Sequence, residues 1–298
     1  MGWGVVVMVL ATAALALARR VIHRTGKLSL ARARVLAARK DLTLDLDDVK
    51  SLAPDVAGAL AKQQGWLSLN GLTTISVESA AKLAKHGGRL SLGGLSSLAA
   101  EAASELAKHG SLLSLGGLKT LSAEAAEALA RKRPWLKLDG LTTLTAESAR
   151  ALANYAHDLV LPGVSTLSAG VAAALATHRG VLCLPGLSSL SKDAAEALVE
   201  TQGDLSLGGL KTLSGELAKT LATHAGGLSL GGLTTLSPEA AAALAEHQGD
   251  LDLAGLSTLS REVAEALARR DGYGLSLDGL STLSTEVAEA LADCQGEA

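Results

Sequence analysis

An internal repeat dominates this sequence, and a repeat restricts the possible folds of a chain more strongly than any local motif does. Starting at Leu44, eleven copies of a 23-residue sequence fill residues 44–298, and only the last copy begins one residue late. A typical copy is LSLGGLTTLSPEAAAALAEHQGD, residues 228–250. Repeats of this length usually form solenoids, because one copy cannot bury its apolar side alone and must stack on its neighbours.

The columns of the repeat, numbered 1–23 within a copy, predict a strand, a turn and a helix. Positions 1 and 3 are always Leu with a mostly polar residue between them, which is typical of a short strand with one buried side. Position 5 is Gly in ten of the eleven copies, which indicates a positive φ or a close approach to another backbone segment. Ser or Thr at position 10 and Glu at position 12 favour a helix start.

The second half of each copy predicts a helix of about ten residues that ends in a turn. Ala at position 14, Leu at position 17 and Ala at position 18 lie on one helical face, and Gly at position 22 suits a helix C-terminus. We therefore predict an α/β fold, a right-handed strand–helix repeat solenoid with a parallel sheet of short strands on one side and helices on the other. Aromatic residues make up only 2% of the chain, so Leu and Ala must fill its core in thin layers.

No pattern in the sequence points to catalysis, to a cofactor or to a metal ion. Cys183 and Cys294 lie far apart and have no metal-binding spacing. Residues 227–231 match GxSxG, but their serine lies inside a predicted strand and not at a strand–helix elbow. Five histidines share position 20, and we interpret them as residues favoured at helix C-termini, with a metal site or a pH response as the alternative: His86, His109, His178, His224 and His247. We predict that the protein is not an enzyme and needs no cofactor.

The LxLxGLxxL pattern resembles that of bacterial leucine-rich-repeat-like proteins over residues 44–298. The resemblance implies a parallel sheet on the concave side, helices outside, partner binding on the concave side and no catalytic residues. Two columns depart from the usual pattern. Position 6 is Leu, Val or Ile where an Asn is usual, as at Leu233, and the Leu expected three residues before the LxL is missing in most copies, as at Ala225.

The N-terminal segment differs from the repeats. Residues 1–18 contain no charged side chain and are followed by Arg19 and Arg20, so this run is just long enough to span a bilayer. We predict that residues 1–20 form a membrane anchor with the repeats in the cytoplasm. A cleaved signal peptide, which implies an exported protein, and a capping helix, which implies a soluble cytoplasmic one, are the alternatives. Residues 21–43 are basic and predict an N-terminal cap that covers the open edge of the repeats.

Position 2 predicts the exposed residues of the strands, and most of them are serine. One apolar interruption is a candidate partner patch: Val160, Pro162, Cys183 and Pro185. Trp66 and Trp135, directly before a strand, are a second candidate, with packing at the edge of the sheet as the alternative.

These observations favour a repeat scaffold for protein–protein interaction, with an exported structural or envelope-associated repeat protein as the alternative. Residues 41–298 carry 19 basic and 30 acidic side chains, and this net charge of −11 disfavours nucleic acid. The last copy shows no polar cap, and its leucines predict end-to-end self-association: Leu275, Leu277, Leu280, Leu283 and Leu291.

Overall fold

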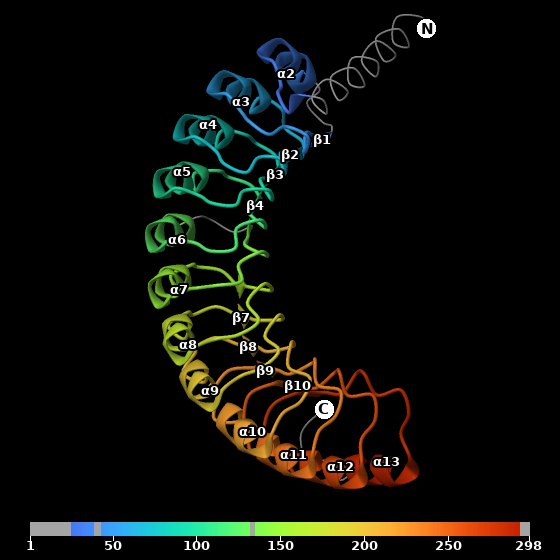
Figure 1. The fold of residues 1–298 in the computed structure, drawn as a ribbon. Helices are drawn as coiled ribbons and strands as arrows, with labels where there is room; N and C mark the ends of the chain where they lie inside the picture. Colours follow the sequence, from blue (N-terminus) through green and yellow to red (C-terminus); the bar gives the residue numbers. More distant parts are fainter. Residues whose placement is uncertain (1–24, 39–42, 132–134, 293–298) are drawn as a thin grey trace, which may run out of the picture. The chain divides into compact units, whose positions relative to one another are not determined.

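A computed structural model describes residues 25–38, 43–131 and 135–292 of the chain. The chain divides into two compact units, Met1–Leu141 (unit 1) and Thr142–Ala298 (unit 2). Within each unit, the strands pair in one sheet and each helix packs against the helix of the next copy (Figure 1).

Unit 1 contains a five-stranded sheet in the order β1-β2-β3-β4-β5. Its described elements are α2 (Leu30–Ala37), β1 (Leu44–Asp45), α3 (Pro54–Leu60), β2 (Leu67–Ser68), α4 (Val77–Leu83), β3 (Leu90–Ser91), α5 (Ala100–Leu106), β4 (Leu113–Ser114), α6 (Ala123–Ala130) and β5 (Leu136–Lys137). Neighbouring strands are parallel and pair at equivalent positions of successive copies, as Leu44 does with Leu67.

Unit 2 contains a six-stranded parallel sheet in the order β11-β10-β9-β8-β7-β6. Its described elements are α7 (Ala146–Ala153), β6 (Leu159–Val160), α8 (Ala169–Leu175), β7 (Leu182–Cys183), α9 (Lys192–Leu198), β8 (Leu205–Ser206), α10 (Gly215–Leu221), β9 (Leu228–Ser229), α11 (Pro238–Ala245), β10 (Leu251–Asp252), α12 (Arg261–Ala268), β11 (Leu275–Ser276) and α13 (Thr285–Ala292). The predicted fold class is therefore confirmed, and so is the leucine-rich-repeat-like character of the chain.

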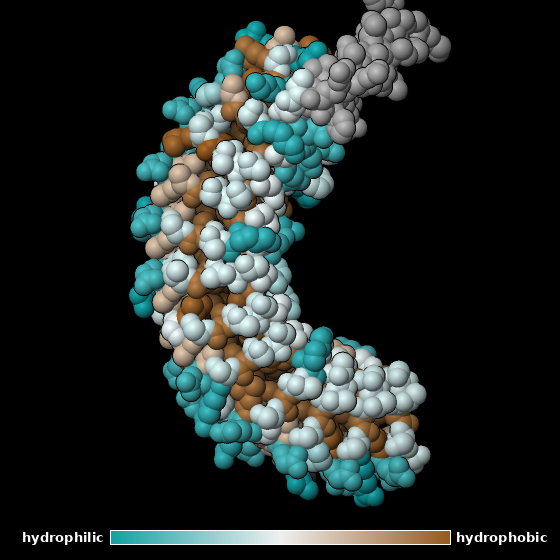
Figure 2. Space-filling view, viewed as in Figure 1, coloured by the Kyte–Doolittle hydropathy of each residue, from teal (hydrophilic) through white to brown (hydrophobic). Residues whose placement is uncertain are grey.

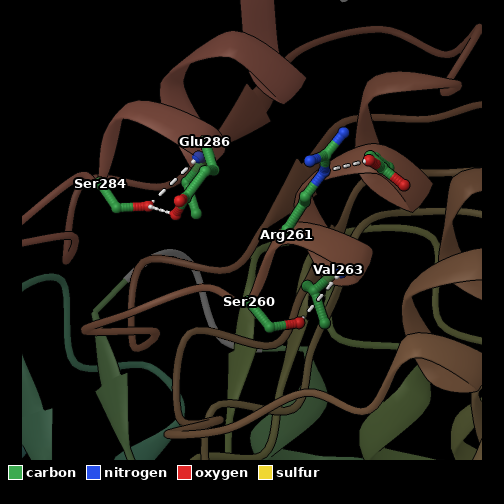
Figure 3. A network of polar contacts seen from close by, with 7 residues as sticks. Ser260, Arg261, Val263, Ser284 and Glu286 are labelled. Carbon is green, nitrogen blue, oxygen red and sulfur yellow. Dashed lines mark hydrogen bonds and ion pairs between the residues drawn. The ribbon is translucent and has the colours of Figure 1, made fainter.

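The helices begin where the sequence predicts and are slightly shorter than predicted. The hydroxyls of Ser260 and Ser284 accept hydrogen bonds of 3.3 Å from the backbone N–H of Val263 and Val287, three residues later. Figure 3 shows both serines, together with Arg261, whose Nε lies 2.7 Å from a Glu265 oxygen. Such caps satisfy N–H groups that have no partner inside a helix. The helices of the repeats span seven or eight residues, because the chain turns back toward the sheet directly after position 17 or 18.

The core of each unit consists of the columns that the sequence indicates. In the copy that starts at Leu228, this leucine and Leu230, Leu233, Ala241 and Leu244 are all at most 1% exposed. Since each copy repeats the same Leu and Ala positions, the core is a continuous stack of thin layers, and Ala at position 14 lets the helix lie close to the strand.

Close backbone packing explains why glycines recur at fixed positions of the repeat. At Gly232, position 5 of its copy, a Cβ atom would lie 1.9 Å from the carbonyl oxygen of Gly208 in the preceding copy. At Gly249, position 22, it would lie 2.3 Å from the carbonyl oxygen of Gly226. A glycine at a helix C-terminus usually has a positive φ, but in the described part of the chain Gly26 is the only glycine that does. The interpretation of position 22 as a helix C-terminal glycine is therefore incomplete.

The predicted membrane association is wrong for the part of the chain that the structure describes. In residues 25–38, 43–131 and 135–292, no helix has the length and apolar character that a bilayer span requires. The segment 1–20, on which the prediction rested, lies outside the described residues. Of the basic segment 21–43, the structure describes α2, which packs on α3, and a parallel bridge between Lys27 and Ser51. Its role as a cap stays a prediction.

Candidate interaction surface

The strand side of unit 2 presents one residue per copy at position 2. Parallel pairing aligns these residues in a single row: Val160, Cys183, Ser206, Ser229, Asp252 and Ser276. Figure 2 shows that in unit 2 the charged residues (teal) lie mainly along the helices, while the surface above them is mostly of intermediate hydropathy (white). A band of apolar residues (brown) runs between these two surfaces.

A groove of about 510 Å³ lies along this row, across β8 to β11. It is lined by residues at positions 1 and 2 of four copies and by the residues directly before each strand. The lining residues are Val181, Asp204, Leu205, Ser206, Gly227, Leu228, Ser229, Asp250, Leu251, Asp252, Gly274, Leu275 and Ser276. We call this feature the strand-side groove.

Three carboxylates give the strand-side groove its chemical character. Asp204 accepts a hydrogen bond of 2.9 Å from the N–H of Gly227. Asp252 accepts one of 2.6 Å from the Ser229 hydroxyl and one of 2.9 Å from the N–H of Ala254. These bonds hold two carboxylates in fixed orientations, and the third, Asp250, also lines the groove. The residues that line it include three acidic side chains and no basic one, so the groove is suited to a cationic group.

Glycine leaves the space that these carboxylates occupy. A Cβ atom at Gly227 would lie 3.0 Å from an Asp204 oxygen, and one at Gly274 would lie 3.1 Å from an Asp250 oxygen. At the residue before the strand, the copies thus alternate between an aspartate and a glycine, and each aspartate reaches over the glycine of the next copy. The sequence analysis missed both aspartates because it considered position 2 alone as the exposed row. The acidic residues at position 23 of alternate copies, Asp204 and Asp250, were the available signal.

The predicted apolar patch lies next to this groove in the same sheet. Val160 and Cys183 are aligned partners on β6 and β7, and Val160 is 46% exposed. Pro162 and Pro185 follow them by two residues, the first half-buried and the second exposed. The four residues therefore occupy adjacent copies, and the row continues from Cys183 to Ser206, which lines the groove. Their role in binding a partner stays a prediction.

The strand side of unit 1 differs from its expected form. Ser68 and Ser91 are buried, although position 2 was predicted to be exposed. The Ser68 hydroxyl donates a hydrogen bond of 2.6 Å to Asp47, and the Ser91 hydroxyl donates one of 2.7 Å to Asn70. Asn70 in turn donates to Asp47 over 3.1 Å, so the acidic and amide side chains at position 4 cover the serines.

The two tryptophans in unit 1 lie on the surface. Trp66 and Trp135 are 47% and 65% exposed, and whether they contact a partner or pack at the edge of the sheet stays a prediction. The position-20 histidines, by contrast, are all buried and do not belong to this surface. Within the described residues, no three His, Cys, Asp or Glu side chains are placed to hold a metal ion.

Comparison with known proteins finds solved structures that have low sequence identity to this chain. No protein-family model matches the chain, and no curated protein is similar to it in sequence. A leucine-rich-repeat protein of Leptospira interrogans is 18% identical over 90% of this chain and 98% of its own, with a TM-score of 0.29. An internalin of Listeria monocytogenes is 13% identical over 95% of this chain and 94% of its own, with a TM-score of 0.40.

A third structure, the Toll–Spätzle complex of Drosophila, is 13% identical over 84% of this chain and 42% of its own, with a TM-score of 0.41. Identities and TM-scores in this range transfer neither a function nor a partner. The fold assignment stands on the repeated strands and helices of the chain itself.

Proposed function

We propose that this chain is a non-enzymatic repeat scaffold that binds an extended, basic segment of a protein partner in the strand-side groove of unit 2. The observation that carries this proposal is the groove itself, which places Asp204, Asp250 and Asp252 along four neighbouring strands. Two of these carboxylates are oriented by hydrogen bonds, so they are ordered before a partner arrives. Preorganised groups lose less entropy on binding than mobile ones.

The dimensions of the groove suit a short peptide. Parallel strands lie about 4.8 Å apart, so four strands span roughly 14 Å, and an extended peptide rises about 3.3 Å per residue. The groove therefore accommodates about four to five residues of an extended partner, with two or three side chains directed toward the carboxylates. The net charge of −11 outside the first 40 residues also favours a basic partner over a nucleic acid.

The apolar patch extends this proposed site. Val160 and Cys183 continue the row of Ser206 and Ser229, so a partner that follows the row would place an apolar side chain next to its basic residues. Exposed apolar residues of this kind are common in contact surfaces. Serine is the natural replacement for the test, because it occupies the same column in neighbouring copies.

Fluorescence anisotropy with labelled eight-residue peptides tests the proposal. The probes are a Lys-Ser alternating peptide, its Glu-Ser counterpart and a Lys-Ser peptide that ends in leucine. We expect the full chain to bind the lysine peptides and not the glutamate peptide. The triple variant Asp204→Asn, Asp250→Asn, Asp252→Asn should weaken binding at least tenfold, while Asp193→Asn on α9 should not. Val160→Ser with Cys183→Ser should remove only the preference for leucine. Equal binding by wild type and triple variant would refute the assignment of the groove.

Self-association through the last described copy is a separate part of the proposal. Leu275, Leu277 and Leu280 are half-buried, whereas their counterparts Leu251, Leu253 and Leu256 in the preceding copy are fully buried. Leu283 is 55% exposed. Apolar side chains in such an arrangement are suited to pack against the corresponding side of another repeat stack.

A further inference from the structure

Each unit contains a column of buried polar side chains at position 20, two or three residues after the end of the helix in each copy. Its described members are at most 5% exposed: Gln63, His86 and His109 in unit 1, and Tyr155, His178, Thr201, His224, His247 and Arg270 in unit 2. We call this set the position-20 column. Buried polar groups are costly unless they are hydrogen-bonded, so each member needs a structural reason.

Most of the histidines in the column bind a backbone carbonyl of the preceding copy. In unit 2, the Nδ1 atoms of His178, His224 and His247 lie 3.1, 3.1 and 3.3 Å from the carbonyl oxygens of residues 153, 199 and 222. In unit 1, His86 Nε2 lies 3.0 Å from the carbonyl oxygen of residue 65. Because a carbonyl oxygen only accepts, the ring nitrogen in each bond must carry the proton. Each of these imidazoles therefore links its copy to the one before.

The second ring nitrogen of these histidines has no partner. His86 Nδ1 and the Nε2 atoms of His178, His224 and His247 are buried and make no hydrogen bond. In the neutral ring this nitrogen carries only a lone pair. Protonation would add a charge to a buried ring, which is unfavourable, and at His86 and His247 this cost of burial exceeds the favourable effect of the nearby backbone carbonyls.

Neighbouring members of the column add to this cost. The rings of His86 and His109 are stacked with centroids 6.0 Å apart, and those of His224 and His247 with centroids 6.4 Å apart. Two charged rings at such a distance would repel each other. His109 thus faces His86 from the following copy, and His224 and the Arg270 guanidinium act on His247, while Gln63 holds the same column position in the copy before His86. Burial lowers the pKa of His86 and of His247, and for His247 the charges of Arg270 and His224 lower it further.

We propose that the position-20 column is an acid-sensitive lock, which holds successive copies together while its imidazoles are neutral and releases them when the surroundings become mildly acidic. The proposal is independent of the strand-side groove and of any partner. It follows from the buried stacked rings, from their bonds to the preceding copy and from the ring nitrogen that makes no hydrogen bond.

The direction and size of the effect follow from proton linkage. The ordinary histidine pKa is about 6.5, and burial in the folded state lowers the pKa of His86 and of His247, so at these two residues the unfolded chain binds more protons below that pH. The stabilising contribution is complete above about pH 6.5 and declines as the pH falls through this value toward the folded pKa. At pH 5.5, each histidine that stays neutral when folded raises the unfolding equilibrium constant roughly tenfold.

Urea unfolding of the full chain at pH 7.5 and pH 5.5, followed by circular dichroism, tests the lock. This interval lies above the ordinary range of carboxyl pKa values, so histidines dominate the change. The variants are His224→Gln with His247→Gln, and the same pair changed to Thr, because Gln63 and Thr201 occupy the same column naturally. The control is His157→Gln, since His157 lies on the surface.

We expect the wild type and the His157 control to unfold at clearly lower urea concentration at pH 5.5 than at pH 7.5. Both double variants should lose part of this difference, equivalent to roughly a tenfold smaller change in the unfolding constant, because they remove the buried His247 imidazole. Histidine proton NMR of the wild type gives a second measurement that needs no variant. The resonances of His86 and His247 should keep their neutral positions at pH 5.5, because burial lowers the pKa of both rings. Titration of His86 and His247 at the ordinary histidine pKa, or unchanged pH dependence in folded double variants, would overturn the proposal.

Discussion

The two glycines at 208 and 209 offer a direct test of why the repeat requires glycine at position 5. They are neighbours in one turn, yet their surroundings differ completely. A Cβ atom on Gly209 would lie 2.4 Å from the carbonyl oxygen of Leu187 and 2.7 Å from that of Pro185. A Cβ atom on Gly208 would meet no heavy atom within 4 Å. The substitutions Gly208→Ala and Gly209→Ala therefore differ only in packing against the preceding copy.

The expected difference can be worked out from these distances. Ordinary contact between a carbon and a neighbouring atom is about 3.5–4.0 Å, so the new methyl group at 209 would be about 1 Å too close to two backbone atoms. The backbone there cannot move freely, because the N–H of Leu187 is hydrogen-bonded to the carbonyl of Leu184 over 3.1 Å. Overpacking of this kind costs about 1–3 kcal/mol. Replacing Gly by Ala also restricts the unfolded chain by about 0.4–1 kcal/mol, but this gain is common to both variants and cancels in the comparison.

We therefore expect Gly209→Ala to be less stable than Gly208→Ala by about 1–3 kcal/mol, or roughly 5- to 160-fold in the unfolding equilibrium constant. Gly208→Ala should match or slightly exceed the wild type. Urea unfolding followed by circular dichroism measures both, and equal slopes would show that the comparison is between similar transitions. Equal midpoints for the two variants would refute the explanation by close backbone approach.

Three further predictions use the same assay or a simple hydrodynamic one. Leu230→Ala should destabilise the protein by about 2–5 kcal/mol because it leaves a cavity in a fully buried layer, whereas Leu283→Ala, at a position 55% exposed, should cost less than about 0.5 kcal/mol. Ser237→Ala should cost about 1 kcal/mol, since the Ser237 hydroxyl accepts the hydrogen bond from Ala240 N–H at the start of α11, and Thr234→Ala in the preceding turn should have little effect. Sedimentation velocity should show concentration-dependent association of the wild type that Leu283→Lys reduces, and a strict monomer at high concentration would contradict self-association.

Much of the fold could be predicted because every column is repeated up to eleven times. A single Leu-Ser-Leu sequence is ambiguous, but eleven of them at a fixed spacing indicate a strand, and the pairing of Leu251 with Leu228 follows directly from the period. The helix caps were predictable for the same reason, because Ser at position 10 recurs before Glu at position 12. A secondary-structure prediction that is ambiguous for one copy thus becomes reliable when the same residues recur in all copies.

The position-20 column shows where this reasoning fails. His247 lies two residues after the end of α11, and a position at a helix end is ordinarily accessible, so the histidine was attributed from the sequence to the helix dipole. The short helix instead lets the chain turn inward at once, which buries the ring against Ala222 and next to Gly249. Whether a residue directly after a helix faces solvent or the next copy depends on the path of the returning chain. Periodicity alone does not fix that path.

The strand-side groove was missed for a related reason. A repeat shows its fold in the positions that all copies share, whereas a binding surface is made by positions at which neighbouring copies differ. Asp204 and Asp250 occupy a position that holds Gly227 in the copy between them. A Cβ atom at 227 would lie 3.0 Å from the Asp204 carboxylate, so the glycine leaves room for that side chain. Position 23 differs between neighbouring copies, and in a solenoid of otherwise uniform copies such positions are where a specific partner can be recognised.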